Sequence, residues 1–203
     1  TLFHELGHGL HGLLSQVRYP SQAGTSVKQD FVELPSQIFE HWATEPEVLK
    51  RYARHYETGQ VISDALIEKI RASSTFNQGF QTSEYLAAAY LDLVWHEQAP
   101  DAAAGVKALE ATEMDRIGLP MTIAPRYKST YFQHIFAGDH YSAGYYAYIW
   151  AEVLDADGFE AFKEQGLFDP ATAQSFRQNI LERGGSAEPM SLYRAFRGRD
   201  PAV

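Results

Sequence analysis

Apolar residues recur at helical spacing along nearly the whole chain. In residues 1–16 the leucines stand at positions 2, 6, 10, 13 and 14, which predicts a helix. Proline and glycine separate further segments of the same period. Together they predict helices at 28–44, 45–55, 63–73, 83–96, 105–115, 145–162, 170–183 and 191–196, with Pro35 either kinking the second helix or delaying its start. We therefore expect an all-α fold with little or no sheet, formed as a single helical domain over residues 1–203.

Composition narrows the range of partners. The 203 residues are 45% hydrophobic and 21% charged, which suits one globular core. The formal net charge of −9 argues against nucleic acid or an anionic membrane as a partner, because no excess of cations is available to meet phosphates. No apolar run approaches the roughly 20 residues of a membrane-spanning helix. We expect a monomer without nucleic-acid or membrane partners.

The chain contains no cysteine. This excludes disulfides, thiolate metal ligands and a cysteine nucleophile. It is also typical of a reducing compartment, so we expect a cytoplasmic protein.

The strongest motif stands at the beginning of the chain. The sequence His4-Glu5-Leu6-Gly7-His8 has the H-E-x-x-H pattern. On a helix, residues four apart share a face, so both imidazoles can bind one zinc ion while Glu5 takes a proton from water. Glycine is costly inside a helix, so Gly7 predicts that another segment packs closely there. A metal ligand so near a fraying terminus also leads us to expect a longer chain, whose N-terminal half is a partner of this part.

A zinc site of this kind needs a third protein ligand. The metzincin pattern would place a histidine at position 14, where Leu14 stands, so that class is excluded. His11 would strain a site built on one short helix, and we interpret it as a packing or supporting residue. The remaining option is a carboxylate from another helix. The candidates by position are Asp30, Glu33, Glu40, Glu45 and Glu47.

Two longer strings resemble a known family. HELGHGLHGLLS, followed by SQAGTSVKQDFVELPSQIFEHWA, is similar to the thimet oligopeptidase family of zinc metallopeptidases. The resemblance implies that this chain is the multi-helix catalytic half of a gluzincin. It also implies one Zn²⁺ per chain, held by His4, His8 and Glu33, with Glu5 as the catalytic base.

A second block, YFQHIFAGDHYSAGYYAYIW, is similar to the loop with which that family contacts its substrate. The resemblance implies that His134, Tyr141 and Tyr148 stabilise the oxyanion of the reaction, and phenol hydroxyls are suitable donors for it. Where the family often has a Gly-Gly pair, this chain has Asp139-His140, so His140 competes with His134 for the functional role. The glycines at 136–144 predict a mobile loop.

Within the family, DFVELPSQIFEHWATEPEV and RYARHYETG are most similar to bacterial peptidyl-dipeptidases, which release dipeptides from the C-terminus of peptides. The alternative is an endopeptidase of the oligopeptidase A type. In both cases the substrates are short peptides, and the fragment alone is expected to be inactive. Two other classes stay open. One is a helical binding module that keeps the motif without metal, and the other is a structural zinc site, which would need a fourth protein ligand.

Overall fold

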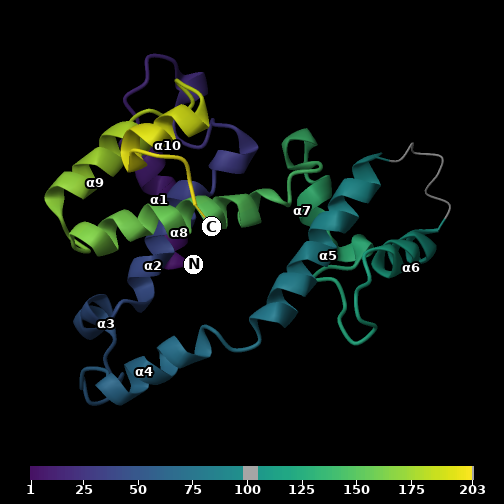
Figure 1. Ribbon diagram of the computed structural model, residues 1–203, viewed down its shortest axis with the longest axis horizontal. Helices are drawn as coiled ribbons and strands as arrows, with labels where there is room; N and C mark the ends of the chain where they lie inside the picture. Colours follow the sequence, from purple (N-terminus) through teal and green to yellow (C-terminus); the bar gives the residue numbers. More distant parts are fainter. Residues whose placement is uncertain (98–104, 203) are drawn as a thin grey trace. The chain divides into compact units, whose positions relative to one another are not determined.

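Helices joined by turns and by longer loops make up the described part of the protein (Figure 1). The computed structural model describes residues 1–97 and 105–202. Over these residues the prediction of an all-α fold is confirmed, since pairing between extended segments is limited to an isolated antiparallel bridge between Arg54 and Val61. Within the same ranges, no helix combines the length and the apolar character that crossing a membrane requires.

The chain divides into two compact units. The first comprises Thr1–Arg71 together with the residues from Ala147 onward. Its α-helices are α1 (Leu2–Leu13), α2 (Leu34–Thr44), α3 (Pro46–Tyr52), most of α4 (Asp64–Ser73), α8 (Ala147–Gln165), α9 (Pro170–Phe176) and α10 (Pro189–Arg197). Short 3-10 turns η1 (Pro20–Gln22) and η2 (Gln29–Phe31) precede α2, and a π-helical turn, η6 (Arg177–Leu181), extends α9.

The second unit comprises the described residues of Ala72–Tyr146. It contains α5 (Gln78–Glu97), α6 (Val106–Arg116), α7 (Gln133–Phe136) and two short turns, η4 (Ser129–Tyr131) and η5 (Asp139–Tyr141). This division into compact units does not decide whether they fold as one domain, so the expectation of a single helical domain over residues 1–203 stays a prediction.

The core of the first unit forms where α2 packs against both α1 and α8. Ile38 of α2 and Leu154 of α8 are fully buried there. Aromatic side chains from α8, α9 and α10 complete this core, among them Phe159, Phe176 and Phe196. Burying this apolar surface fixes α2 between its two neighbours.

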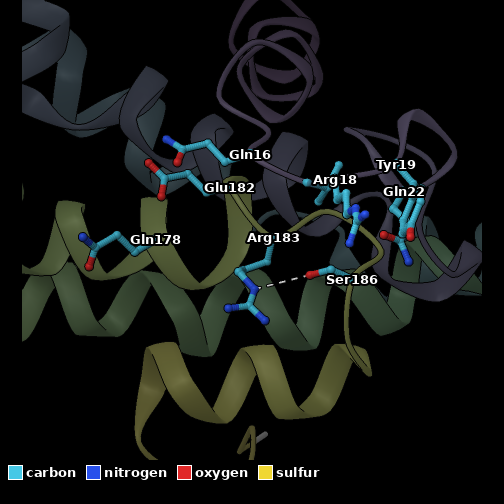
Figure 2. A pocket seen from close by; sticks show the side chains of 9 residues that line it. Gln16, Arg18, Tyr19, Gln22, Gln178, Glu182, Arg183 and Ser186 are labelled. Atoms are coloured by element: carbon cyan, nitrogen blue, oxygen red, sulfur yellow. Dashed lines mark hydrogen bonds between the residues drawn. The ribbon is translucent and has the colours of Figure 1, made fainter.

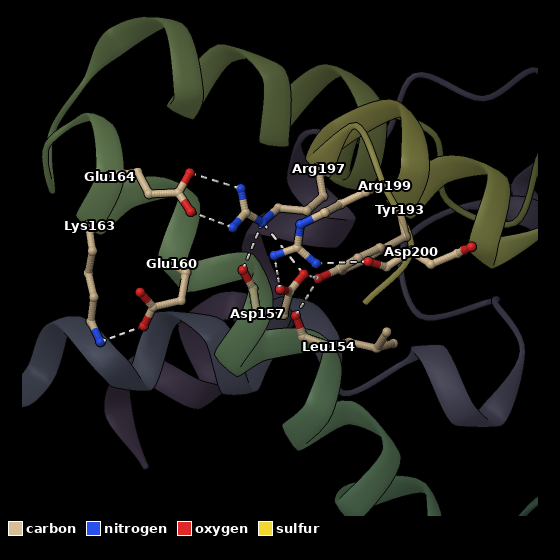
Figure 3. Close-up of polar contacts among 9 residues, drawn as sticks. All are labelled: Leu154, Asp157, Glu160, Lys163, Glu164, Tyr193, Arg197, Arg199 and Asp200. Carbon is tan, nitrogen blue, oxygen red and sulfur yellow. Dashed lines mark hydrogen bonds and ion pairs between the residues drawn. The ribbon is translucent and has the colours of Figure 1, made fainter. Parts of the chain in front are cut away.

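A polar cluster fastens α10 to α8 (Figure 3). Asp157 of α8 is buried, and its carboxylate accepts a hydrogen bond of 2.5 Å from the Tyr193 hydroxyl. Arg197 and Arg199 pair with the same carboxylate, and Arg197 also forms a bidentate pair with Glu164. The buried charge is thus fully paired, as burial demands.

The helix ends follow local chemistry. Pro35 does not kink α2, which begins late, at Leu34, with the proline in its first turn. Asp169 caps α9 by accepting a 2.7 Å hydrogen bond from the Thr172 amide. The predicted start of α5 at Ser83 is wrong, since the helix begins at Gln78 and tolerates an exposed Gly79 in its first turn.

Candidate metal centre

Helix α1 presents His4 and His8 on one face, with ring centroids 4.9 Å apart. The predicted close packing at Gly7 is confirmed. A β-carbon at Gly7 would lie 2.6 Å from the α-carbon of Ser36, so only glycine lets α1 approach the start of α2 this closely. The approach brings both histidines to Glu33, the residue immediately before α2.

Three ligand atoms converge at this crossing. Nε2 of His4 and Nε2 of His8 each lie 3.3 Å from Oε2 of Glu33. All three atoms lie within 4.8 Å of one another, and no other cluster of potential metal ligands occurs in the described part of the chain. Two ligands bound at zinc's usual distances in a tetrahedral site stand about 3.4 Å apart, so the spacing and the two-nitrogen, one-oxygen donor set fit zinc.

Neighbouring side chains orient the donors. The Ser36 hydroxyl donates a 2.7 Å hydrogen bond to Oε2 of Glu33. Nδ1 of His4 lies 2.6 Å from Oε1 of Glu40, and a proton shared there leaves Nε2 free to face the site. Glu40 was a candidate third ligand by position, but it contacts the far side of the His4 ring. Ser36 stands three positions after Glu33, and this spacing at the start of a helix was a signal in the sequence that the serine hydroxyl could reach the carboxylate.

Hydrogen bonds and charges at the site favour the deprotonated form of the Glu33 carboxylate, which is the form that binds a metal ion. Burial raises the pKa of Glu33, but hydrogen bonds from His8 and Ser36 and the charges of both histidines outweigh it, so the pKa lies below its ordinary value. The hydrogen bond to Glu33 raises the pKa of His8, against the effect of burial. The side chains of His4 and His8 are 21% and 22% exposed, so solvent reaches the centre.

Glu5 and His11 complete the polar positions of α1. Glu5 is exposed, and its charge contributes to the raised pKa of His8. His11 is fully buried, and neither ring nitrogen has a hydrogen-bond partner among the described residues. Burial lowers the pKa of His11 to about 4, so the ring is neutral. This agrees with the interpretation of His11 as a packing residue.

A buried polar link that the sequence analysis missed joins α2 to α8. Gln37 donates to Asp155 at 3.0 Å and to the backbone carbonyl of Tyr148 at 3.3 Å, while Nε2 of His41 lies 2.6 Å from Asp155. Burial raises the pKa of Asp155. The link holds the first turn of α8, which contains Tyr148, against α2. Asp155, which stands among apolar residues of α8, was the available signal.

The structure brings together two of the loop residues named from the resemblance. His134 of α7 and Tyr141 of η5 have ring centroids 4.7 Å apart. His140 is exposed and its ring lies 4.2 Å from that of Tyr141. These three belong to the second unit, whereas Tyr148 belongs to the first, with the metal-site residues.

A polar pocket of about 450 Å³ also occurs in the first unit (Figure 2). It lies between the segment after α1 and the residues around η6, and its lining includes Arg18, Gln178 and Arg183. None of the three converging ligand residues lines this pocket. We therefore place the candidate chemistry at the α1–α2 crossing.

Comparison with known proteins gives the family. Residues 1–203 match the family described as peptidase family M3. The chain is 47% identical over 209 residues to a dipeptidyl carboxypeptidase of Escherichia coli, and 43% identical over 208 residues to oligopeptidase A of the same species. Both matches cover 100% of this chain but only 30% of the relative's length. Since the family match spans the whole described fold and its histidine-glutamate centre, this chain belongs to peptidase family M3.

Proposed function

We propose that the complete protein is a zinc metallopeptidase that hydrolyses short peptides, with His4, His8 and Glu33 holding one Zn²⁺. The observation that carries this proposal is the convergence of two imidazole Nε2 atoms on Oε2 of Glu33, each at 3.3 Å. Membership of peptidase family M3 supports it. The converged donors also favour a metal site over a metal-free binding module.

The residues of this chain have separate roles in the proposed reaction. A zinc ion held by these residues would supply Lewis acidity at the scissile carbonyl and its attacking water. Glu5 accepts the proton of that water and returns it to the leaving amine. Tyr141, Tyr148 and His134 donate hydrogen bonds to the oxygen on which negative charge develops. Three protein donors converge, and a site that would hold zinc with three rather than four protein ligands is typical of catalysis, which favours a catalytic over a structural site.

Zinc content tests the ligand assignment. We expect about one zinc per chain in the full-length protein and its loss in Glu33→Ala. Glu45→Ala is the matched control, since Glu45 was also a candidate by position but is absent from the cluster. A Glu33→Ala variant that retains zinc and full affinity would overturn the assignment. Glu5→Gln should keep the metal and lose peptide cleavage, which separates the base from the ligands.

We further propose release of C-terminal dipeptides, supported by the 47% identity to a dipeptidyl carboxypeptidase. The 43% identity to oligopeptidase A supports internal cleavage as the second candidate. A peptide with a free C-terminus and its C-terminal amide distinguish them. A peptidyl-dipeptidase should release dipeptides from the first and act poorly on the second, since it must recognise the terminal carboxylate. Equal cleavage of both at internal bonds would favour the endopeptidase.

A further inference from the structure

Asp92, in the second unit, is a buried carboxylate that accepts hydrogen bonds from backbone amides of a loop. Asp92 lies on α5 beside Leu91 and is fully buried. A carboxylate in such a position is costly unless hydrogen bonds satisfy it. Its Oδ1 accepts a 2.9 Å hydrogen bond from the amide of Ala143, and its Oδ2 accepts one of 2.8 Å from the amide of Tyr145. Nδ1 of His96, one turn along α5, lies 2.9 Å from Oδ1.

The loop that Asp92 holds has an unusual backbone. Ala143 has φ of +54°, a left-handed conformation that residues with a β-carbon seldom adopt. The two amides bonded to Asp92 flank Gly144, so the carboxylate spans the turn. On one side of the turn stands Tyr141, whose ring contacts His134. On the other, the buried ring of Tyr145 packs against Phe132 at 4.9 Å.

We propose that Asp92 is a positioning residue for residues 139–146, the loop that carries Tyr141. This inference rests on the proposed peptidase function. Two hydrogen bonds donated by loop amides to one carboxylate fix the direction of the chain just after Tyr141. The carboxylate itself is fixed by a 20-residue helix. Stabilising an oxyanion requires a donor that is already in place, and a small displacement weakens it strongly. Asp92 therefore acts on the reaction through Tyr141.

The test uses the full-length zinc-loaded protein and Asp92→Asn. The amide keeps the shape of the side chain but turns an NH₂ group toward one of the two loop amides, so one hydrogen bond is lost. We expect kcat to fall roughly ten- to a hundredfold, with KM changed less and zinc content unchanged. Glu110→Gln is the matched control, because Glu110 is a buried carboxylate of the same unit that accepts a 2.6 Å hydrogen bond from the Ser129 amide. The control should keep the wild-type kcat.

A double-mutant cycle separates positioning from general stability. If Asp92 acts through Tyr141, Asp92→Asn should lower kcat much less in a Tyr141→Phe background than alone. The same fold-loss in both backgrounds, or an equal loss in Glu110→Gln, would overturn the inference. Should Asp92→Asn fail to fold, His96→Gln, which removes the imidazole beside Oδ1, carries the same cycle with the same expected direction.

Hydrogen exchange gives a reading that does not depend on cleavage. The peptide covering 139–146 should exchange its amides faster in Asp92→Asn than in wild type, and unchanged exchange would contradict the role of Asp92. If wild type fails to cleave peptides, the proposed function falls, while exchange still decides whether Asp92 holds the loop.

Discussion

The α-carbon of Gly7 faces Ser36 so closely that a β-carbon on Gly7 would lie 2.6 Å from the Ser36 α-carbon. Gly7→Ala must therefore push α1 away from α2 and separate the histidines from Glu33. We expect weaker zinc binding and a loss of roughly 1–3 kcal/mol in the free energy of unfolding. Zinc titration and urea unfolding measure the two effects.

Gly9→Ala is the control on the same helix. Beyond the adjoining backbone of α1 itself, no atom lies within 4 Å of a β-carbon placed at Gly9, so alanine there should only improve helix propensity, by about 1 kcal/mol. Equal zinc affinity in the two variants would contradict the close-packing explanation.

Glu40 contacts His4, one of the proposed ligands, without belonging to the cluster of converging donors. Glu40→Ala removes the partner of Nδ1 on His4, and we expect zinc affinity to fall by roughly ten- to a hundredfold. Glu47→Ala, which removes an exposed carboxylate paired with Arg51 on α3, should leave the affinity unchanged. Competition with a chelator of known affinity measures both. A Glu40 variant that binds zinc like wild type would show that the hydrogen bond does not control His4.

His11 predicts a pH dependence of stability. Burial lowers its pKa to about 4 in the folded protein, whereas a histidine in an unfolded chain titrates near 6.5. As pH falls through this window the unfolded chain gains a proton that the folded chain does not, so stability falls. His11→Leu removes this contribution. In urea unfolding with EDTA present, the free energy of unfolding of the variant should rise relative to that of wild type as pH falls from 6.5 to about 4. A constant difference across that range would contradict a buried, neutral His11.

Asp157 leads us to predict a second loss of stability in acid, this time from a paired carboxylate. Burial raises its pKa, but hydrogen bonds from Tyr193 and Arg199 and the charges of both arginines outweigh it, so the pKa lies below its ordinary value of 3.8. A carboxyl group with a depressed pKa stabilises the fold above its unfolded pKa, and the contribution is lost as pH falls through the folded one. Asp157→Asn should therefore cost about 3 kcal/mol near neutral pH. The difference in free energy of unfolding between this variant and wild type should decrease as pH falls below about 3.8, and urea unfolding across this pH range measures it.

The exposed pair Glu160–Lys163 supplies the control for this measurement (Figure 3). Both side chains are about half exposed, so Glu160→Gln should change the free energy of unfolding by less than about 1 kcal/mol. A loss in Glu160→Gln as large as that in Asp157→Asn would show that burial does not set the difference.

Sequence reasoning reached the helices and the histidine pair because both depend on local spacing. The third donor was different: five carboxylates were possible by position, and only the family resemblance favoured Glu33. The contact of Glu40 with His4 depends on how α1 crosses α2, which no local pattern specifies. The same holds for the hydrogen bonds of Asp155 to Gln37 and of Asp92 to Ala143, which join residues more than fifty positions apart in the chain. The ligand assignment itself stays a prediction until zinc is measured.

All three converging donors come from one pair of crossed helices, α1 and the start of α2. A bound ion would therefore act as a cross-link that closes the intervening loop between residues 8 and 33, in the way that a disulfide closes a loop. That loop contributes the buried Phe31 to the core of the first unit, and Leu14 and Val27 pack against the same core. Removing the metal should consequently lower the free energy of unfolding of the whole first unit, because the loop that the ion would close is packed into that unit's core.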